Sequence, residues 1–88
     1  MDRRRDMKVS VLFFSVLREV AGADRVEREY PEKGFLLGDL VEEMANEFPG
    51  LVAWKGRLLL AVNQEYAEPG LELADGDEVA LMPPVQGG

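Results

Sequence analysis

The feature that most constrains the fold is a single amphipathic segment near the middle of the chain, residues 37–48. Along it, apolar side chains recur every three or four residues, the spacing of one helix face: Leu37, Leu40, Val41, Met44, Ala45 and Phe48. Acidic residues in its first half suit the positive end of the helix dipole, and Pro49-Gly50 ends the pattern. No Ser, Thr, Asp or Asn stands directly ahead of Leu37, so the sequence predicts one helix whose start is poorly capped and frays.

The segments on either side of this helix have the composition of β-strands. Residues 8–15 are rich in β-branched and aromatic side chains, which predicts a strand. Alternation puts Val9, Val11 and Phe13 on a core face and Leu12 and Phe14 on the opposite face. The other expected elements are a short helical turn at 17–21, a charged edge strand at 25–30, a buried strand at 58–62, a very short strand near 66–67 and a final strand at 78–82. Residues 51–56 have no clear pattern.

One helix among several strands predicts an α+β domain, in which a mixed sheet of about four to five strands has one main helix packed across one face. The first and last strands are the most hydrophobic, so we expect them side by side in the centre of the sheet. Phe14 and Met82 would then lie close together on the face away from the core, where clustered apolar groups indicate a docking surface or a second small core. We expect residues 1–6 to be an unstructured extension, 7–82 the domain and 83–88 a flexible tail.

Composition limits the chemistry that this chain can perform. With 88 residues it forms one small domain, and without cysteine or histidine it has no disulfide, thiol chemistry or Ser-His arrangement. We therefore expect no metal site and no catalytic side chains of its own, and the lack of disulfides is compatible with a cytoplasmic location. A net charge of −7 disfavours nucleic acid and anionic membranes as partners. The acidity suits a partner with a basic surface, and it also suits simple solubility.

The last six residues are unlike the end of an ordinary compact domain. Pro83 and Pro84 cannot donate to a strand ladder, so they should end the final strand and direct the tail away from the sheet. Gly87 and Gly88 have no Cβ, so this backbone can enter a narrow channel with its carboxylate unshielded. The tail therefore has the form of a stiff spacer that carries an accessible carboxylate.

Several short motifs together resemble the small, sulfur-carrying subunits of molybdopterin synthase, a branch of the ubiquitin-like β-grasp proteins. From Met7 onward the matching segments are Val11-Leu12-Phe13-Phe14, Leu17-Arg18-Glu19, Ala21-Gly22, Gly38-Asp39-Leu40, Ala61-Val62-Asn63-Gln64, Asp75-Gly76-Asp77-Glu78-Val79 and Pro83-Pro84-Val85-Gln86-Gly87-Gly88. The chain departs from the family at Leu36, where a capping threonine is common, and at Met82, where an aromatic residue is common.

The resemblance implies that the carboxylate of Gly88 is the reacting group. It implies that an ATP-dependent enzyme adenylates Gly88, that a sulfur donor then displaces AMP to leave a thiocarboxylate, and that no cofactor is bound permanently. The thiocarboxylate would donate sulfur to a cyclic pterin phosphate inside the large subunit, in an expected heterotetramer. Gly87 would give clearance in the channel, and Pro83, Pro84, Val85 and Gln86 would form the spacer. We assign partner binding to Phe14, Tyr66 and Met82.

Three alternatives remain open from the sequence. A sulfur carrier for thiamin biosynthesis would share the fold and the Gly-Gly end, although the paired phenylalanines, Leu17-Arg18-Glu19 and the Pro-Pro spacer favour the molybdopterin branch. A ubiquitin-like modifier would use the same activation to join Gly88 to lysines of other proteins. The third alternative is an interaction domain whose tail has no chemistry.

Overall fold

The computed structural model describes residues 6–31 and 33–84, which form a sheet with helices on one side. The elements in chain order are β1 (Asp6–Phe13), α1 (Val16–Ala21), β2 (Arg25–Pro31), α2 (Leu37–Glu47), the 3-10 helix η1 (Pro49–Arg57), β3 (Leu59–Val62), β4 (Glu65–Tyr66) and β5 (Glu78–Met82). No helix among these residues is long and apolar enough to cross a membrane.

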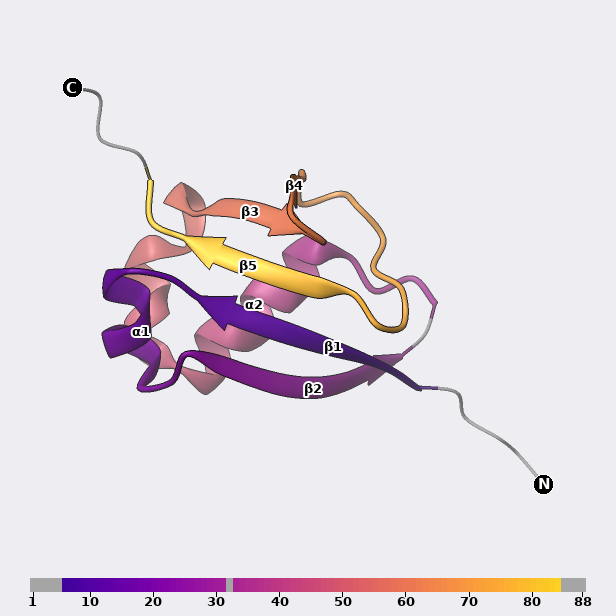
Figure 1. Cartoon of the computed structure of the whole chain (residues 1–88), viewed down its shortest axis with the longest axis horizontal. Coiled ribbons are helices and arrows are strands. Elements are labelled where there is room, and N and C mark those ends of the chain that lie inside the picture. Colours follow the sequence, from indigo (N-terminus) through magenta and orange to yellow (C-terminus); the bar gives the residue numbers. More distant parts are fainter. Residues whose placement is uncertain (1–5, 32, 85–88) are drawn as a thin grey trace.

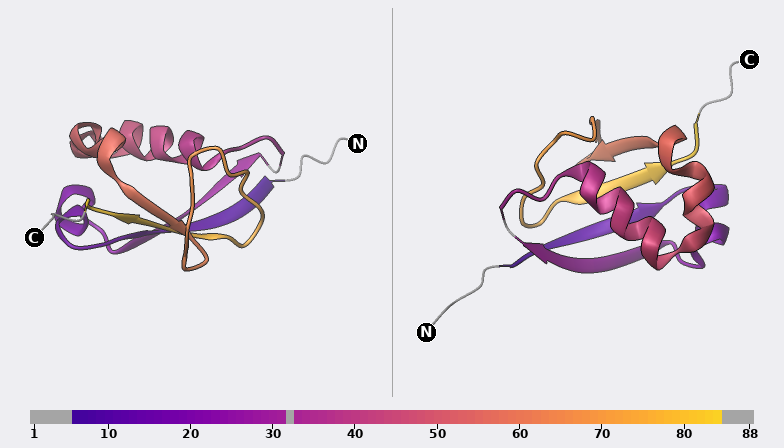
Figure 2. Two further views of the ribbon diagram at one scale, coloured as in Figure 1. Left: turned by 90° about the horizontal axis from the view of Figure 1, so that it is seen from above. Right: turned by 180° about the vertical axis from the view of Figure 1, so that it is seen from behind.

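The five strands form one mixed sheet in the order β2-β1-β5-β3-β4. The central pair, β1 and β5, is parallel, and the other pairs are antiparallel. Helix α2 runs across one face of the sheet, and the other face has no helix over it (Figures 1 and 2). The predicted α+β architecture and the central placement of the first and last strands are both confirmed.

The core lies between α2 and the covered face of the sheet. Strand β1 alternates as predicted, with Val9, Val11 and Phe13 each no more than 2% exposed. The apolar stripe of α2 packs against the same layer. The large side chains with less than 2% exposure are Met7, Val9, Val11, Leu17, Leu37, Leu40, Met44, Leu51, Leu73, Val79 and Leu81. Covering this face therefore accounts for the hydrophobic stabilisation of the domain.

Strand β1 begins and ends two residues earlier than the sequence predicts. It starts at Asp6, which the sequence assigned to the unstructured extension, because Asp6 pairs with Pro31 and Met7 with Tyr30 on β2. It ends at Phe13, because Ser15 has a φ of 55° and turns the chain out of the sheet. Residues 1–5 of the predicted extension lie outside the described residues.

The start of α2 is held in a way that the sequence did not predict. The N–H of Leu36 donates to Asp39 Oδ2 at 2.9 Å. The N–H groups of Leu37 and Gly38 donate to the carbonyls of Leu71 and Pro69, at 2.8 and 2.9 Å. Leu36 provides no side-chain cap, as predicted, but a distant loop supplies acceptors to these first N–H groups, which removes the physical reason for fraying.

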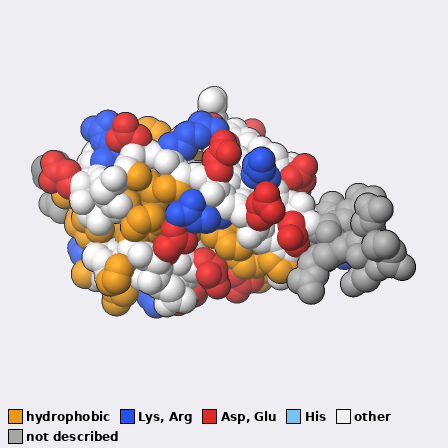
Figure 3. All heavy atoms as spheres, turned by 90° about the horizontal axis from the view of Figure 1, so that it is seen from below, with side chains coloured by type: hydrophobic (Ala, Val, Ile, Leu, Met, Phe, Trp, Pro, Cys, Tyr) orange, Lys and Arg blue, Asp and Glu red, His pale blue; other side chains and the backbone are white. Residues whose placement is uncertain are grey.

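Strand β2 is an edge strand of the sheet, as predicted. Its outward positions are charged or proline, and acidic and basic side chains are interspersed over this side of the molecule (Figure 3). Charge at an exposed edge discourages pairing with another chain.

The segment after α2, for which the sequence showed no clear pattern, is the 3-10 helix η1. It begins at Pro49, and it has Leu51 buried and Trp54 at the edge of the core.

Candidate functional site

The site predicted from the sequence begins where β5 ends. The strand stops at Met82, and Pro83 and Pro84 follow it half-buried, as expected of residues that cannot donate to the ladder. Val85, Gln86, Gly87 and Gly88, which include the predicted reacting group, lie outside the described residues. The structure therefore describes only the first two residues of the tail, which follow the end of the central strand β5.

The face of the sheet away from α2, which we call the open face, is hollowed beside this strand. One cross-strand row runs through Leu12, Ala80, Ala61 and Tyr66 on β1, β5, β3 and β4. The two middle strands contribute only alanines to this row, whereas the flanking strands contribute large side chains. The small residues in the middle leave a depression between the larger ones.

This open-face hollow has a volume of about 340 Å³ and brings the predicted docking residues together. Phe14, Tyr66 and Met82 all line it, although they come from three different parts of the chain. Phe14 is 43% exposed and Tyr66 is 78% exposed. The hollow is lined by Leu12, Phe14, Ala61, Gln64, Tyr66, Glu78, Ala80 and Met82. Exposed aromatic groups around an apolar depression supply the area that a protein partner can bury.

Phe14 is held over the hollow by an unusual turn. Its N–H donates to the carbonyl of Leu81 at 3.2 Å, which keeps it beside the end of β5. Its carbonyl accepts from the N–H of Leu17 at 3.0 Å. Between them, Ser15 has φ 55° and ψ −134°, the conformation of the second residue of a type II′ turn, where glycine is favoured. The strained turn therefore fixes the direction in which the chain leaves Phe14.

The opposite side of the hollow depends on the turn between β3 and β4. Asn63 and Gln64 both have positive φ, 52° and 73°, which makes the tight reversal that brings Tyr66 back beside β3. The Asn63 side chain donates to Asp77 Oδ1 at 2.9 Å and accepts from the N–H of Glu78 at 3.0 Å. This turn is therefore tied to the start of β5.

Sequence reasoning missed part of this site. Ala61, Gln64, Glu78 and Ala80 line the hollow, but none was predicted to do so. Alternation along each strand gives the face on which a residue lies. The register between strands, which brings the two alanines together, was not visible in the sequence.

Among the residues that the structure describes, the groups with a shifted pKa are Arg28, Tyr30 and Glu47, which lie on the helix side of the sheet. A hydrogen bond from Arg28 lowers the pKa of the Glu47 carboxyl, and burial raises the pKa of Tyr30 to about 12. Within residues 6–31 and 33–84 no group of three or more acidic side chains is placed to hold a metal ion. What the described part of the site offers chemically is a shaped apolar surface with hydrogen-bonding groups at its border.

Comparison with known proteins gives a consistent result. Residues 11–88 match the model of the ThiS family. The molybdopterin synthase sulfur carrier subunit of Mycobacterium tuberculosis is 38% identical over 82 residues, covering 93% of this chain and 99% of that protein. The human protein of the same name is 36% identical, with 92% and 94% covered. The Escherichia coli protein is 38% identical, with 91% and 99% covered.

Solved structures share the fold over most of their length. A putative molybdopterin converting factor subunit 1 from Pyrococcus furiosus is 33% identical with a TM-score of 0.78, covering 90% of this chain and 99% of that one. The small archaeal modifier protein 1 of Haloferax volcanii is 30% identical with a TM-score of 0.78, covering 92% and 99%. A complex of subunits 1 and 2 of the molybdopterin-converting factor from Helicobacter pylori gives 30% identity and a TM-score of 0.65, covering 93% and 100%.

Proposed function

This chain belongs to the ThiS family, and from that we propose that it is a sulfur carrier in molybdenum cofactor biosynthesis, acting as the small subunit of molybdopterin synthase. The observation that carries the proposal is the open-face hollow, which is lined by three predicted docking residues and lies beside the strand that leads into the Gly-Gly tail. The relative of known structure from Helicobacter pylori is in complex with a second subunit, which supports a large-subunit partner.

The proposed chemistry takes place at the carboxylate of Gly88. A terminal carboxylate has an ordinary pKa of about 3.5, so it is ionised at neutral pH and resists attack by a nucleophile. An activating enzyme would join this carboxylate to the α-phosphorus of ATP, with pyrophosphate leaving. A sulfur donor would then form a carbon–sulfur bond and release AMP, which leaves a thiocarboxylate. The acyl-adenylate and the thiocarboxylate at Gly88 are thus covalent intermediates, and the proposal includes no permanently bound cofactor.

The other residues are assigned by position. Gly87 gives the tail clearance in a narrow channel, and Pro83, Pro84, Val85 and Gln86 carry the thiocarboxylate away from the domain. Phe14, Tyr66 and Met82 pack against the large subunit, whose own side chains catalyse sulfur transfer to the cyclic pterin phosphate. We place the reaction in the cytoplasm, in a heterotetramer of two small and two large subunits, without nucleic acid or membrane.

Reconstitution tests this proposal directly. The chain is incubated with a molybdopterin synthase adenylating enzyme, ATP and a sulfur source, and its intact mass is measured. We expect the mass to rise by the exchange of one oxygen for one sulfur, and the product to form pterin dithiolene when the large subunit and the pterin precursor are added. The same chain without Gly88 is the control, and we expect neither change. An unmodified full-length chain under conditions that activate a known carrier would refute the proposal.

A second function has one observation in its favour. The small archaeal modifier protein 1 of Haloferax volcanii has the same TM-score, 0.78, as the converting factor subunit from Pyrococcus furiosus, which supports a ubiquitin-like modifier joined through Gly88 to lysines. Mass spectrometry of cell extracts, searching for lysines that carry the C-terminal peptide of this chain, decides between the modifier and the sulfur carrier. Such conjugates would establish the modifier function, and a thiocarboxylate without conjugates favours the carrier alone.

A further inference from the structure

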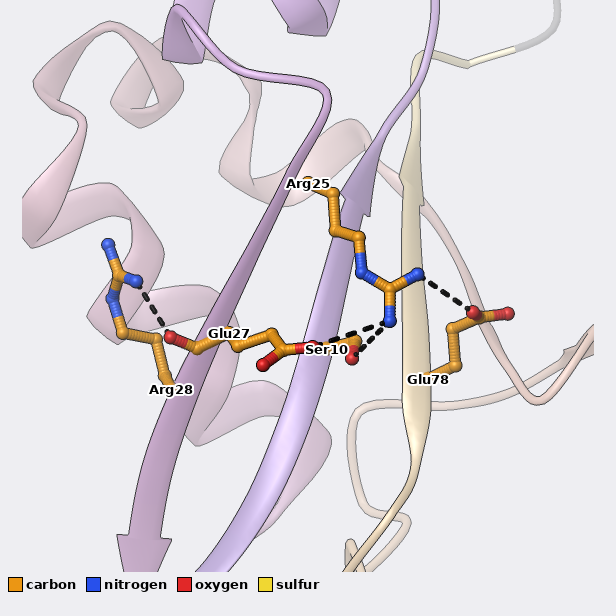
Figure 4. A network of polar contacts seen from close by, with 5 residues as sticks. All are labelled: Ser10, Arg25, Glu27, Arg28 and Glu78. Carbon is orange, nitrogen blue, oxygen red and sulfur yellow. Dashed lines mark hydrogen bonds and ion pairs between the residues drawn. The ribbon is translucent and has the colours of Figure 1, made fainter.

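Arg25 lies at the start of edge strand β2, but its side chain reaches the central strand β5. Its neighbour in register on β1 is Leu12, a residue that lines the open-face hollow. Figure 4 shows the Arg25 side chain lying across β1, with its guanidinium between Ser10 and Glu78. Nη2 donates to Ser10 Oγ at 2.9 Å, and Nη1 lies 3.5 Å from Glu78 Oε2. One side chain thus connects β2, β1 and β5 on the open face.

Glu78 is the acidic residue that lines the hollow, and its position is fixed from both ends. Its backbone N–H donates to Asn63 Oδ1, and its carbonyl accepts from the Asn63 N–H at 2.8 Å. Its carboxylate is held through Oε2 by Arg25. Among the residues that the structure describes, none donates to Glu78 Oε1. An ionised carboxylate accepts several hydrogen bonds, so a second donor can bind the free oxygen.

The Arg25 contacts are poorly placed to stabilise the fold. The Arg25 and Glu78 side chains are 48% and 35% exposed, and the additional Arg25–Glu27 pair is also at the surface. Exposed ion pairs contribute little to the free energy of unfolding, because water screens them and ordering long side chains costs entropy. Charges at the border of an interface instead determine which partner docks and how fast.

We propose that Arg25 is a positioning residue for docking, which holds the Glu78 carboxylate at the border of the open-face hollow for a lysine or arginine of the large subunit. This inference rests on the proposed carrier function. The net charge of −7 agrees with a basic side chain on the partner surface. The apolar residues of the hollow supply contact area, whereas the held carboxylate sets the orientation in which the partner docks.

The test is a double-mutant cycle measured as the dissociation constant for the purified large subunit of molybdopterin synthase from the same organism. We expect Glu78→Gln to weaken binding about fivefold and Arg25→Gln about two- to threefold, the range for a charge pair at an interface border. Because Arg25 acts through Glu78, adding Arg25→Gln to Glu78→Gln should cause no further loss. Arg25→Lys should restore only part of the affinity, because an ammonium group cannot reproduce the planar fork of a guanidinium.

Arg28→Gln is the matched control. Arg28 is on the same strand and also pairs with a glutamate, but this partner is Glu47 of α2 on the helix side. Its loss should leave binding unchanged. Thermal unfolding of each variant checks that the domain is folded.

The outcomes separate this inference from the function on which it rests. If the unaltered chain does not bind the large subunit, the proposed function fails and this inference with it. If it binds and Arg25→Gln has no effect, or if the effects of Arg25→Gln and Glu78→Gln add, the positioning role is refuted while the carrier function stands. Equal loss with Arg28→Gln would also refute it, because general charge and not position would then control binding.

Discussion

Phe13 and Phe14 are identical side chains at adjacent positions, yet they belong to different surfaces of the protein. Phe13 is 2% exposed and meets Phe48 edge to face, with ring centroids 5.6 Å apart. Phe14 is 43% exposed on the open face beside the root of the tail. The same contrast holds between Leu81, which is fully buried, and Met82, which lines the hollow.

This contrast shows that the two faces of the sheet in this small domain have different roles. Each strand alternates between the two faces of the sheet, so the covered face can supply stability while the open face keeps apolar groups for a partner. Replacing a residue on the covered face should therefore change the stability of the fold, and replacing one on the open face should change partner binding.

Phe13→Ala should cost about 3–5 kcal/mol of the free energy of unfolding, because it removes a buried ring and leaves a cavity. Chemical denaturation followed by tryptophan fluorescence at Trp54 measures this loss. Phe14→Ala is the matched variant and should cost less than about 1 kcal/mol. Equal losses from the two variants would mean that the faces do not differ in the way described.

Tyr66→Ala should weaken binding of the large subunit by about tenfold, because aromatic side chains that become buried at an interface carry much of its free energy. Its effect on the unfolding midpoint should be small, since the side chain is 78% exposed. Calorimetry of the complex measures the first quantity, and thermal unfolding of the free chain the second. Val52→Ala, at an exposed apolar position on η1, is the control and should leave binding unaltered.

Ser15→Gly should stabilise the domain by about 0.5–1 kcal/mol. Glycine relieves the backbone strain of a positive φ, and the greater conformational entropy that it gives the unfolded chain offsets part of this gain. Binding should be unchanged, because glycine favours the same turn and the hydrogen bond from the Leu17 N–H to the Phe14 carbonyl is retained. Ser15→Ala keeps the Cβ and therefore the strain, so it should not stabilise. Denaturation midpoints of the two variants give the answer, and a gain from alanine would show that the serine hydroxyl, and not the backbone, is responsible.

The Arg28–Glu47 pair on the helix side should give the smallest effect, a pH dependence well below about 1 kcal/mol, because both side chains are partly exposed. Arg28 lowers the pKa of Glu47 below its ordinary value of 4.5. Stability from this pair is therefore present above pH 4.5 and lost as the pH falls through the lowered pKa. Glu47→Gln should remove that part of the acid dependence of the unfolding midpoint. An unchanged acid profile would show that the pair adds nothing.

Local patterns predicted much of this fold. The period of the apolar residues gave α2, and alternation gave the correct face for Phe13 and for Phe14. These features depend on neighbours in the chain. The start of α2 was misjudged because its first N–H groups are satisfied by Pro69 and Leu71, far along the sequence.

The site was predicted only in part, for the same reason. The sequence supplied Phe14, Tyr66 and Met82, and the structure places all three around one hollow. It could not supply the hollow itself, because the depression arises from the register that aligns Ala61 with Ala80. The reach of Arg25 across β1 to Glu78 was equally hidden, because it requires three strands to be in place.

The parallel pairing of β1 with β5 has a consequence for synthesis of the protein. Strand β1 leaves the ribosome first, but one of its two neighbours in the sheet is made only when residue 82 has been added. Nearly the whole chain must therefore be free before the centre of the sheet can close, and such pairing of distant segments slows folding. A chain that ended before residue 78 would lack both β5 and the Gly-Gly tail, so an activating enzyme that recognises this tail would meet it only on chains that can complete the sheet.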